Sequence, residues 1–124
     1  MLIKCIDFLN KELILFSMDG LQRSIPSMVD GLKPGQWNIL FFSFKRNFVT
    51  QEKVAQFSGY VSENSSYHQS QHSISTTIIG MAKDFVGSNN INLLAPLREF
   101  GMRAHGGKYH ASTRYVFAFL SPIT

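Results

Sequence analysis

The amino-acid sequence predicts a mainly α-helical chain that ends in a small β wing, and three observations indicate this. Apolar residues recur at helical spacing in four separate segments between residues 1 and 87. Two apolar, β-prone segments follow at 91–94 and 115–120, and the long polar stretch 98–113 lies between them. The second and third helical segments are joined by a short turn, as in a helix-turn-helix. Together these features predict a winged-helix domain of the helix-turn-helix, CAP-like type.

The first segment is expected to form an amphipathic helix that ends at Gly20. It begins almost at Met1 without a capping residue, as though the chain started inside a larger fold. Its apolar residues share one helical face: Leu2, Ile6, Leu9, Leu13 and Phe16.

A second helix is expected after the turn signals at 30–31 and 34–35, with Pro34 in its first turn. Its predicted apolar stripe consists of Trp37, Leu40, Phe41, Phe44 and Phe48. After a short connection at 47–50, Thr50 is a plausible N-cap for a third helix. The inward residues of that third helix would be Val54, Phe57 and Val61.

A fourth helix is expected after Ser66 and Gln69, which have the spacing of a capping box. Gly87 would close it. Its predicted apolar face consists of Ile74, Ile78, Met81, Ala82 and Phe85.

The composition is that of a single globular domain that is not secreted. The chain has 124 residues, of which 44% are hydrophobic and 16% charged. The single cysteine, Cys5, excludes a disulfide framework within the chain and indicates a reducing compartment. Charged residues interrupt the N-terminal apolar segment, so neither a signal peptide nor a membrane span is predicted. The net charge of +4 is compatible with a nucleic-acid partner and does not require one.

The dipeptide Arg114-Tyr115 is the strongest candidate for chemistry. Tyrosine is a poor nucleophile at its free pKa of about 10. A neighbouring guanidinium can hold a phosphate with two parallel hydrogen bonds and stabilise charge that develops there. The pair therefore fits either attack on a phosphodiester or a strand tyrosine beside a surface arginine.

Nucleotide and metal sites are poorly supported by the sequence. The stretch 101–108 fails as a P-loop, because no alignment puts both its glycines and Lys108 in the required places. His68 and His72 have helical ligand spacing but no acidic or thiolate partner nearby. No acidic residue lies within three positions of another, so no local carboxylate cluster for magnesium is predicted.

Several long motifs give the chain a family resemblance. RSIPSMVDGLKPGQ at 23–36 closely resembles the start of the DNA breakage-reunion core of type IIA DNA topoisomerases. Further matches follow in the family's order: KVAQFSGYVSE at 53–63, SSYH at 65–68, TTIIGMAKDFVGSNNINLL at 76–94, GGK at 106–108 and ASTRY at 111–115. They cover essentially the whole chain, and their wording is closest to eukaryotic nuclear topoisomerase II, the plant type included.

The resemblance identifies the chain as a partial winged-helix domain that grips the DNA to be cut. The expected parts are a lead-in helix at 1–19, a helix-turn-helix part at 20–87, and a wing with a tyrosine strand at 88–124. The resemblance implies that Tyr115 attacks a backbone phosphate and becomes linked to the 5′ end of the DNA. It makes Arg114 and Arg23 the other members of the catalytic group. The implied DNA-binding residues are Lys33, His68, Gln69 and Lys108.

The chain departs from the family pattern near these residues. Trp37 and Asn38 stand where the family usually has two DNA-facing basic residues, and Trp37 is expected to extend the apolar stripe. Gln69 replaces a histidine that assists at the cleaved phosphate, and it cannot carry a proton or a positive charge. Pro96-Leu97-Arg98 replaces a usual Pro-Asn-Gly turn, and Tyr109 replaces an aspartate.

The resemblance also implies cofactors and partners. The family enzyme is an ATP-hydrolysing isomerase that uses Mg²⁺, acts as a homodimer on double-stranded DNA in the nucleus, and has no membrane partner. Its ATPase, metal-binding and coiled-coil regions lie outside the matched motifs, so no metal or ATP is assigned to this chain's own residues, and the isolated chain is expected to be inactive. Two alternatives stay open, a non-catalytic DNA-binding winged helix and a degenerate gene remnant.

Overall fold

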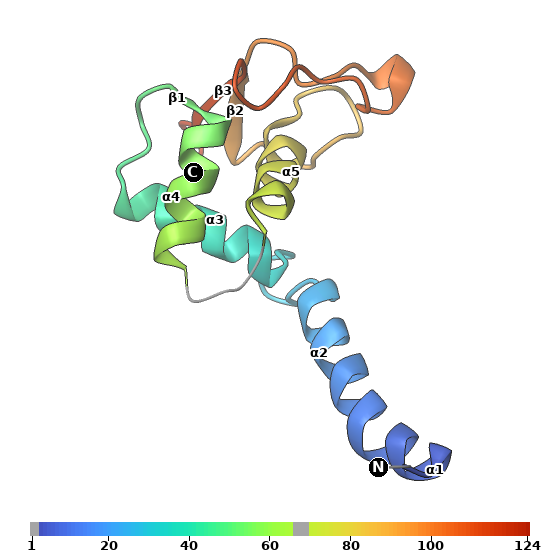
Figure 1. Cartoon of the computed structure of the whole chain (residues 1–124). Helices are drawn as coiled ribbons and strands as arrows, with labels where there is room; N and C mark the ends of the chain where they lie inside the picture. The colour runs from blue at the N-terminus through green and yellow to red at the C-terminus, as the bar shows by residue number, and fades with distance from the viewer. Residues whose placement is uncertain (1–2, 66–69) are drawn as a thin grey trace. The chain divides into compact units, whose positions relative to one another are not determined.

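The computed structural model describes residues 3–65 and 70–124. The chain forms two compact units, Met1–Trp37 and Asn38–Thr124, which we call the first and second unit (Figure 1). In the described residues, no helix combines the length and the apolar character needed to cross a membrane. The three-part division of the chain expected from the sequence stays a prediction.

The first unit is dominated by a helix in three consecutive pieces: α1 (Cys5–Phe8), a π-helical turn η1 (Leu9–Leu13) and α2 (Ile14–Ser24). The predicted end at Gly20 is wrong. A glycine inside a helix costs only about 1 kcal/mol relative to alanine. The helix ends instead before Ile25, which is extended because Pro26 follows it.

The apolar face predicted for this helix is exposed throughout. No residue of α1, η1 or α2 is buried. Ile6, Leu9, Leu13 and Phe16 all count among the exposed large hydrophobic residues, and Leu2 lies outside the described residues. The helix therefore has no core of its own within the described part of the first unit.

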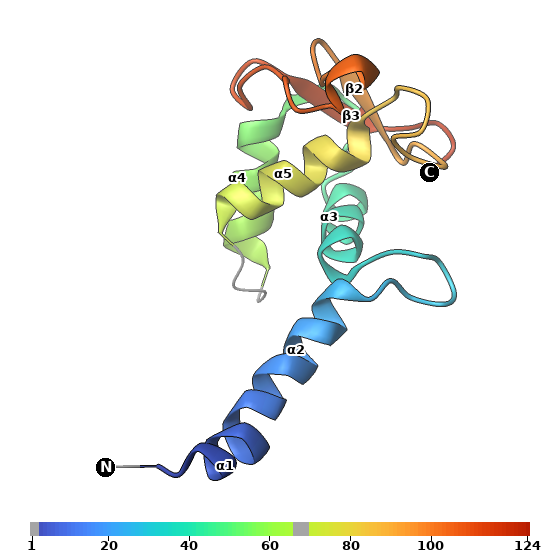
Figure 2. The same ribbon diagram turned by 90° about the vertical axis from the view of Figure 1, so that its right-hand side faces the viewer.

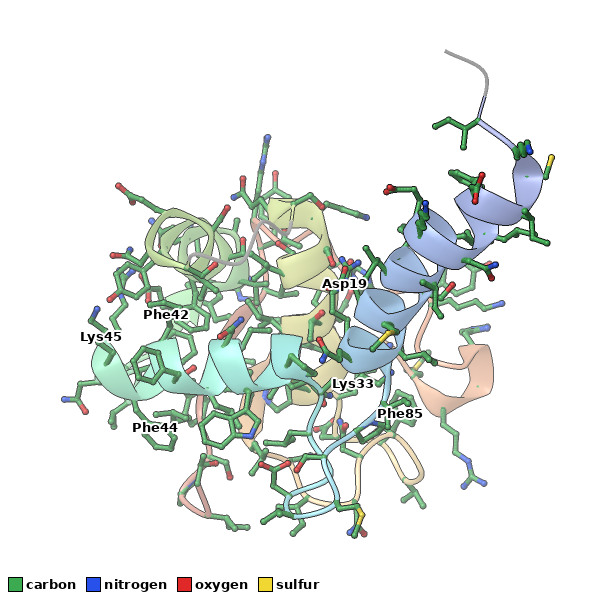
Figure 3. All side chains as sticks on the ribbon, turned by 90° about the horizontal axis from the view of Figure 1, so that it is seen from below. Asp19, Lys33, Phe42, Phe44, Lys45 and Phe85 are labelled. Atoms are coloured by element: carbon green, nitrogen blue, oxygen red, sulfur yellow. The ribbon has the colours of Figure 1, made fainter. Side chains whose placement is uncertain are left out.

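Helix α3 (Pro34–Lys45) begins at Pro34, as predicted, but its buried face is not the predicted one. Leu40 is buried, whereas Trp37, Phe41 and Phe44 are each about half exposed. The buried side is completed by Ile39, Phe42 and Ser43. Figure 3 shows Phe42 and Phe44 on opposite sides of the helix. Because α3 is apolar on nearly every side, spacing alone could not identify the packed face.

Helix α4 (Val54–Asn64) confirms the predicted inward face, since Val54, Phe57 and Val61 are buried. Phe48, in the α3–α4 connection, stacks on Phe57 with 4.1 Å between ring centroids. The predicted N-cap Thr50 is wrong. Strand β1 (Glu52–Lys53) intervenes, and the capping position falls on Lys53.

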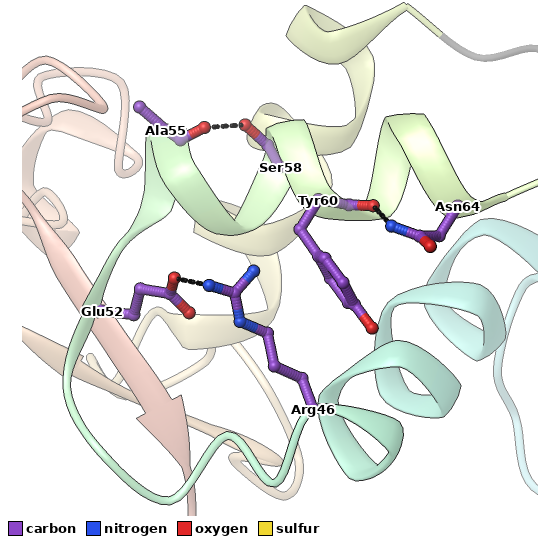
Figure 4. A network of polar contacts seen from close by, with 6 residues as sticks. All are labelled: Arg46, Glu52, Ala55, Ser58, Tyr60 and Asn64. Atoms are coloured by element: carbon purple, nitrogen blue, oxygen red, sulfur yellow. Dashed lines mark hydrogen bonds and ion pairs between the residues drawn. The ribbon is translucent and has the colours of Figure 1, made fainter.

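A polar cluster joins α3, β1 and α4 (Figure 4). The guanidinium of Arg46 forms an ion pair with Glu52 and lies 4.5 Å from the ring centroid of Tyr60. Glu52 is the register partner of Ala118 in the sheet. The cluster thus ties the start of α4 to the end of α3.

Helix α5 (Gln71–Ala82) buries most of the residues predicted for it, namely Ile74, Ile78, Met81 and Ala82. Its N-cap is Ser70, whose hydroxyl accepts from the Ser73 amide at 3.3 Å, and the predicted capping pair Ser66 and Gln69 lies outside the described residues. Phe85 lies beyond the helix, so its place on the predicted face is wrong. The Asn89 amide caps the last turn by donating to the carbonyls of Gly80 (2.9 Å) and Lys83 (2.8 Å).

The sheet has the strand order β1-β3-β2 and is antiparallel throughout. Strand β2 (Leu94–Leu97) and strand β3 (Phe117–Leu120) begin three and two residues later than the apolar segments suggested. Leu94 pairs with Leu120, and Leu97 pairs with Phe117. Figure 2 shows α4 and α5 side by side, with the sheet at one end of the pair. The predicted class, mainly α with a small β wing, is confirmed.

Candidate functional site around Tyr115

Tyr115 lies in a turn at 113–115, immediately before β3, and not in the strand predicted from its apolar neighbours. The backbone on both sides of this turn is held by the start of α4. The amide of Val54 donates to the carbonyl of Val116 at 3.1 Å, and the amide of Ala55 donates to that of Thr113 at 3.1 Å. The first amides of a helix have no partner within the helix, so the tyrosine turn satisfies two of them.

The side chains at this turn differ sharply in exposure. Val116 is completely buried, whereas Tyr115 is 67% exposed and Arg114 is exposed as well. The phenol therefore stands clear of the fold on a backbone that is fixed from two sides. A guanidinium directly beside it supplies the hydrogen-bond donors that a phosphate needs.

The wing between β2 and β3 concentrates positive charge near Tyr115. Basic groups are spread along the sequence as a whole, but residues 98–115 contain four basic side chains and one carboxylate, all exposed or partly exposed. They are Arg98, Arg103, Lys108 and Arg114, against Glu99. Counting charges within the predicted loop alone would have shown this excess. Such a segment attracts phosphate groups without reading base sequence.

Two glycines fix the base of the wing. Gly101 has φ 98° and Gly107 has φ 70°, and a Cβ atom on Gly101 would lie 2.9 Å from the carbonyl oxygen of Gly107. The two sides of the wing therefore touch backbone to backbone, which only glycine allows here. Lys108 follows directly, and its amide donates to the carbonyl of His105 at 3.2 Å while its side chain is exposed.

An open hollow beside Tyr115 brings in a residue that sequence reasoning missed. Its volume is about 460 Å³, and it is lined by Arg98, Glu99, Ala111 and Tyr115. Arg98 has φ 83°, in the left-handed region that costs an L-residue about 1–2 kcal/mol. Its guanidinium lies 5.4 Å from the ring centroid of Phe117. The sequence marked Pro96-Leu97-Arg98 only as a departure from the expected turn, since it carries no sign of the φ value.

Arg23, predicted to be catalytic, is the penultimate residue of α2 in the first unit. Its guanidinium forms an ion pair with the carboxylate of Asp19, one helical turn earlier, and both side chains are about half exposed. Tyr115 and Arg114 belong to the second unit. Joint action of Arg23 with Tyr115 therefore stays a prediction.

Lys33 directly precedes the first residue of α3. Its carbonyl accepts from the Trp37 amide at 3.0 Å, and the Gln36 side chain reaches back to the Lys33 amide at 2.9 Å. This is the return half of a capping box. The preceding loop is equally ordered by Asp30, which accepts from the Leu32 amide at 2.9 Å and from the Trp37 indole.

The Leu32 amide and then the Trp37 indole hold the pKa of Asp30 below its ordinary value of 3.8, because both donate to the charged carboxylate. Trp37 is thus engaged in a polar contact at its indole nitrogen while its ring is half exposed. Its predicted packing in the apolar stripe of α3 is wrong.

The remaining predicted residues, His68 and Gln69, lie outside the described residues. Among residues 3–65 and 70–124, no group of three or more His, Cys, Asp or Glu side chains is placed to hold a metal ion. The described residues therefore do not fit a magnesium site.

Comparison with known proteins places these features in a family context. The family model for DNA gyrase/topoisomerase IV matches residues 23–124. DNA topoisomerase 2 of Arabidopsis thaliana is 64% identical over 118 residues, and DNA topoisomerase 2-alpha of Cricetulus griseus is 61% identical over 118 residues. Each match covers 95% of this chain and 8% of the relative, so the chain spans a small part of the relatives' length.

A solved structure agrees. The crystal structure of the Plasmodium falciparum topoisomerase II DNA-binding, cleavage and re-ligation domain superposes with a TM-score of 0.84 and 51% sequence identity. The superposition covers 93% of this chain and 16% of that one.

Proposed function

This chain belongs to the DNA gyrase/topoisomerase IV family, and from that premise we propose that it supplies the DNA-gripping and DNA-cleaving part of a type II DNA topoisomerase. Such an enzyme is an isomerase that changes DNA topology. One observation of the structure carries the proposal: Tyr115 projects, 67% exposed, from a turn that α4 holds on both sides. Arg114 lies next to it and the basic wing precedes it.

The proposed reaction is a transesterification at a backbone phosphate of double-stranded DNA. The Tyr115 oxygen forms a bond to phosphorus and loses its proton, while the bond from phosphorus to the 3′ oxygen breaks and that oxygen gains a proton. The products are a 5′-phosphotyrosyl link and a free 3′ hydroxyl. The covalent link keeps the phosphodiester energy for the reverse step, which rejoins the strand.

The other site residues have proposed roles in holding the DNA. Arg114 clamps the phosphate under attack, and Arg23 adds a second guanidinium to the catalytic group. Lys33 and Lys108 contact the DNA backbone and position the duplex without reading its sequence. His68 and Gln69 complete the DNA-binding set, with Gln69 acting only through hydrogen bonds.

The cofactors and partners follow from the family as further proposals. ATP and Mg²⁺ serve the full-length enzyme, and in the described residues nothing is placed to hold the metal. When bound, Mg²⁺ supplies charge stabilisation for oxygens at the phosphate. We also propose a homodimer acting on DNA in the nucleus.

A second candidate is a DNA-binding winged helix that does not cleave. It is favoured by the lack of a metal-ligating group in the described residues, and it shares the basic wing with the first candidate. The two candidates differ only at Tyr115, because both need phosphate contacts.

Titration of duplex DNA against salt tests the DNA-binding part common to both. Contact by the four basic side chains of 98–115 would make log affinity fall with log salt at a slope of about −3.6, since each neutralised phosphate contributes about −0.9. Arg114→Gln and Lys108→Gln should each reduce the magnitude of the slope by about 0.9. A flat or absent salt response of the unaltered chain rejects DNA binding through this face, and with it both candidates.

A further inference from the structure

We propose that Arg98 makes the hollow beside Tyr115 a subsite for a second backbone phosphate of the DNA strand, in addition to the one under attack. The inference rests on the proposed function, and it extends that function to a residue that the resemblance assigns no role. Its ligand class is a phosphodiester of the nucleic-acid backbone.

The backbone at Arg98 gives the first step. Among the described residues, Asn47 and Arg98 are the two non-glycine residues with positive φ, at 52° and 83°. Asparagine tolerates this region because its short polar side chain can hydrogen-bond locally. Arginine has no such compensation, so the strained backbone is a reason to look for a function of the side chain.

The side chain gives the second step. The guanidinium lies over the ring of Phe117, and Phe117 is the first residue of β3, two positions after Tyr115. A guanidinium whose face lies on an aromatic ring keeps its in-plane N–H groups available, and these donors match phosphate oxygens. In the part of the chain that the structure describes, the ion pairs involve Arg23 and Arg46 and not Arg98.

The hollow gives the third step. Arg98 and Tyr115 both line it, so a phosphate held by Arg98 would lie on the same side of the wing as the attacking oxygen. Glu99 also lines the hollow, and its carboxylate opposes a bound anion. The net attraction therefore depends on Arg98, and Glu99→Gln should raise the affinity for DNA because it removes the opposing charge.

The test compares three variants of the full chain in the salt titration of duplex DNA. Arg98→Gly and Arg98→Asn both remove the charge and suit the left-handed backbone, whereas Arg98→Lys keeps the charge. We expect the first two to reduce the magnitude of the salt slope by about 0.9, so that their loss of affinity between 50 and 200 mM salt is about 3.5-fold smaller than that of the unaltered chain. Arg98→Lys should keep the slope.

Thermal unfolding separates this role from a structural one. Arg98→Gly should raise Tm, because it relieves the backbone strain, and still lose that part of the salt slope. If the unaltered chain responds steeply to salt and Arg98→Gly responds equally steeply, the Arg98 subsite is overturned while the proposed function stands. A flat response of the unaltered chain overturns both.

Discussion

Replacing Gly101 with alanine should destabilise the second unit more than the same replacement at Gly87. The two glycines have nearly the same φ, 98° and 90°, so both variants lose about 1–2 kcal/mol to the left-handed backbone. A Cβ atom at Gly87 meets nothing within 4 Å. A Cβ atom at Gly101 meets the backbone of Gly107, with its oxygen at 2.9 Å and its Cα at 3.0 Å.

This contact cannot be relieved by turning a side chain, so the two sides of the wing must separate. Overpacking of this kind costs about 1–3 kcal/mol more, which gives about 2–5 kcal/mol for Gly101→Ala against about 1–2 kcal/mol for Gly87→Ala. Urea unfolding followed by far-ultraviolet circular dichroism measures both. With a slope of about 2 kcal/mol per M, the midpoint for Gly101→Ala should lie about 0.5–1.5 M below that for Gly87→Ala. Equal midpoints would refute the close contact at the base of the wing.

Two further predictions concern the core and the loop before α3. Phe57→Ala should lower the free energy of unfolding by about 3–5 kcal/mol, because Phe57 is fully buried against Phe48, whereas Phe44→Ala should change it by less than about 0.5 kcal/mol; similar losses in urea unfolding would contradict the assigned face of α3. Because hydrogen bonds lower the pKa of Asp30 below 3.8 in the folded chain, its contribution to stability is present above that pH and is lost as pH falls through the lowered value. The fluorescence of Trp37, the chain's single tryptophan, should therefore show an acid step below pH 3.8 that Asp30→Asn lacks, and a step above pH 3.8 would contradict the contact.

The sequence predicts those elements whose local pattern allows one interpretation. Val54, Phe57 and Val61 recur on a helix with polar residues between them, so both the helix and its inward face are predicted correctly. Around Trp37, apolar residues occupy several faces of α3, and only the tertiary contacts select the buried one. Gly20 does not end its helix, because the cost of one glycine is small compared with the effect of the following Ile25-Pro26.

The candidate site divides in the same way. Residue types and the resemblance both point to Arg114-Tyr115, but the short apolar run after Tyr115 wrongly favours a strand there. The turn depends on hydrogen bonds from Val54 and Ala55, about sixty residues earlier in the chain, which no local pattern contains. Arg98 escapes sequence reasoning for a related cause, since its left-handed backbone and its place beside Tyr115 exist only in three dimensions.

Formation of a covalent DNA adduct at Tyr115 tests the central claim most directly. The chain would be incubated with nicked duplex DNA and Mg²⁺, with and without the metal-binding domain of a family enzyme, and adducts would be digested and located by mass spectrometry. Tyr109 is a matched control, because it lies in the same segment and is 75% exposed against 67% for Tyr115. We predict a 5′-phosphotyrosyl adduct that persists in Tyr109→Phe and disappears in Tyr115→Phe. No adduct even with the added domain, or an adduct that survives Tyr115→Phe, would contradict the account.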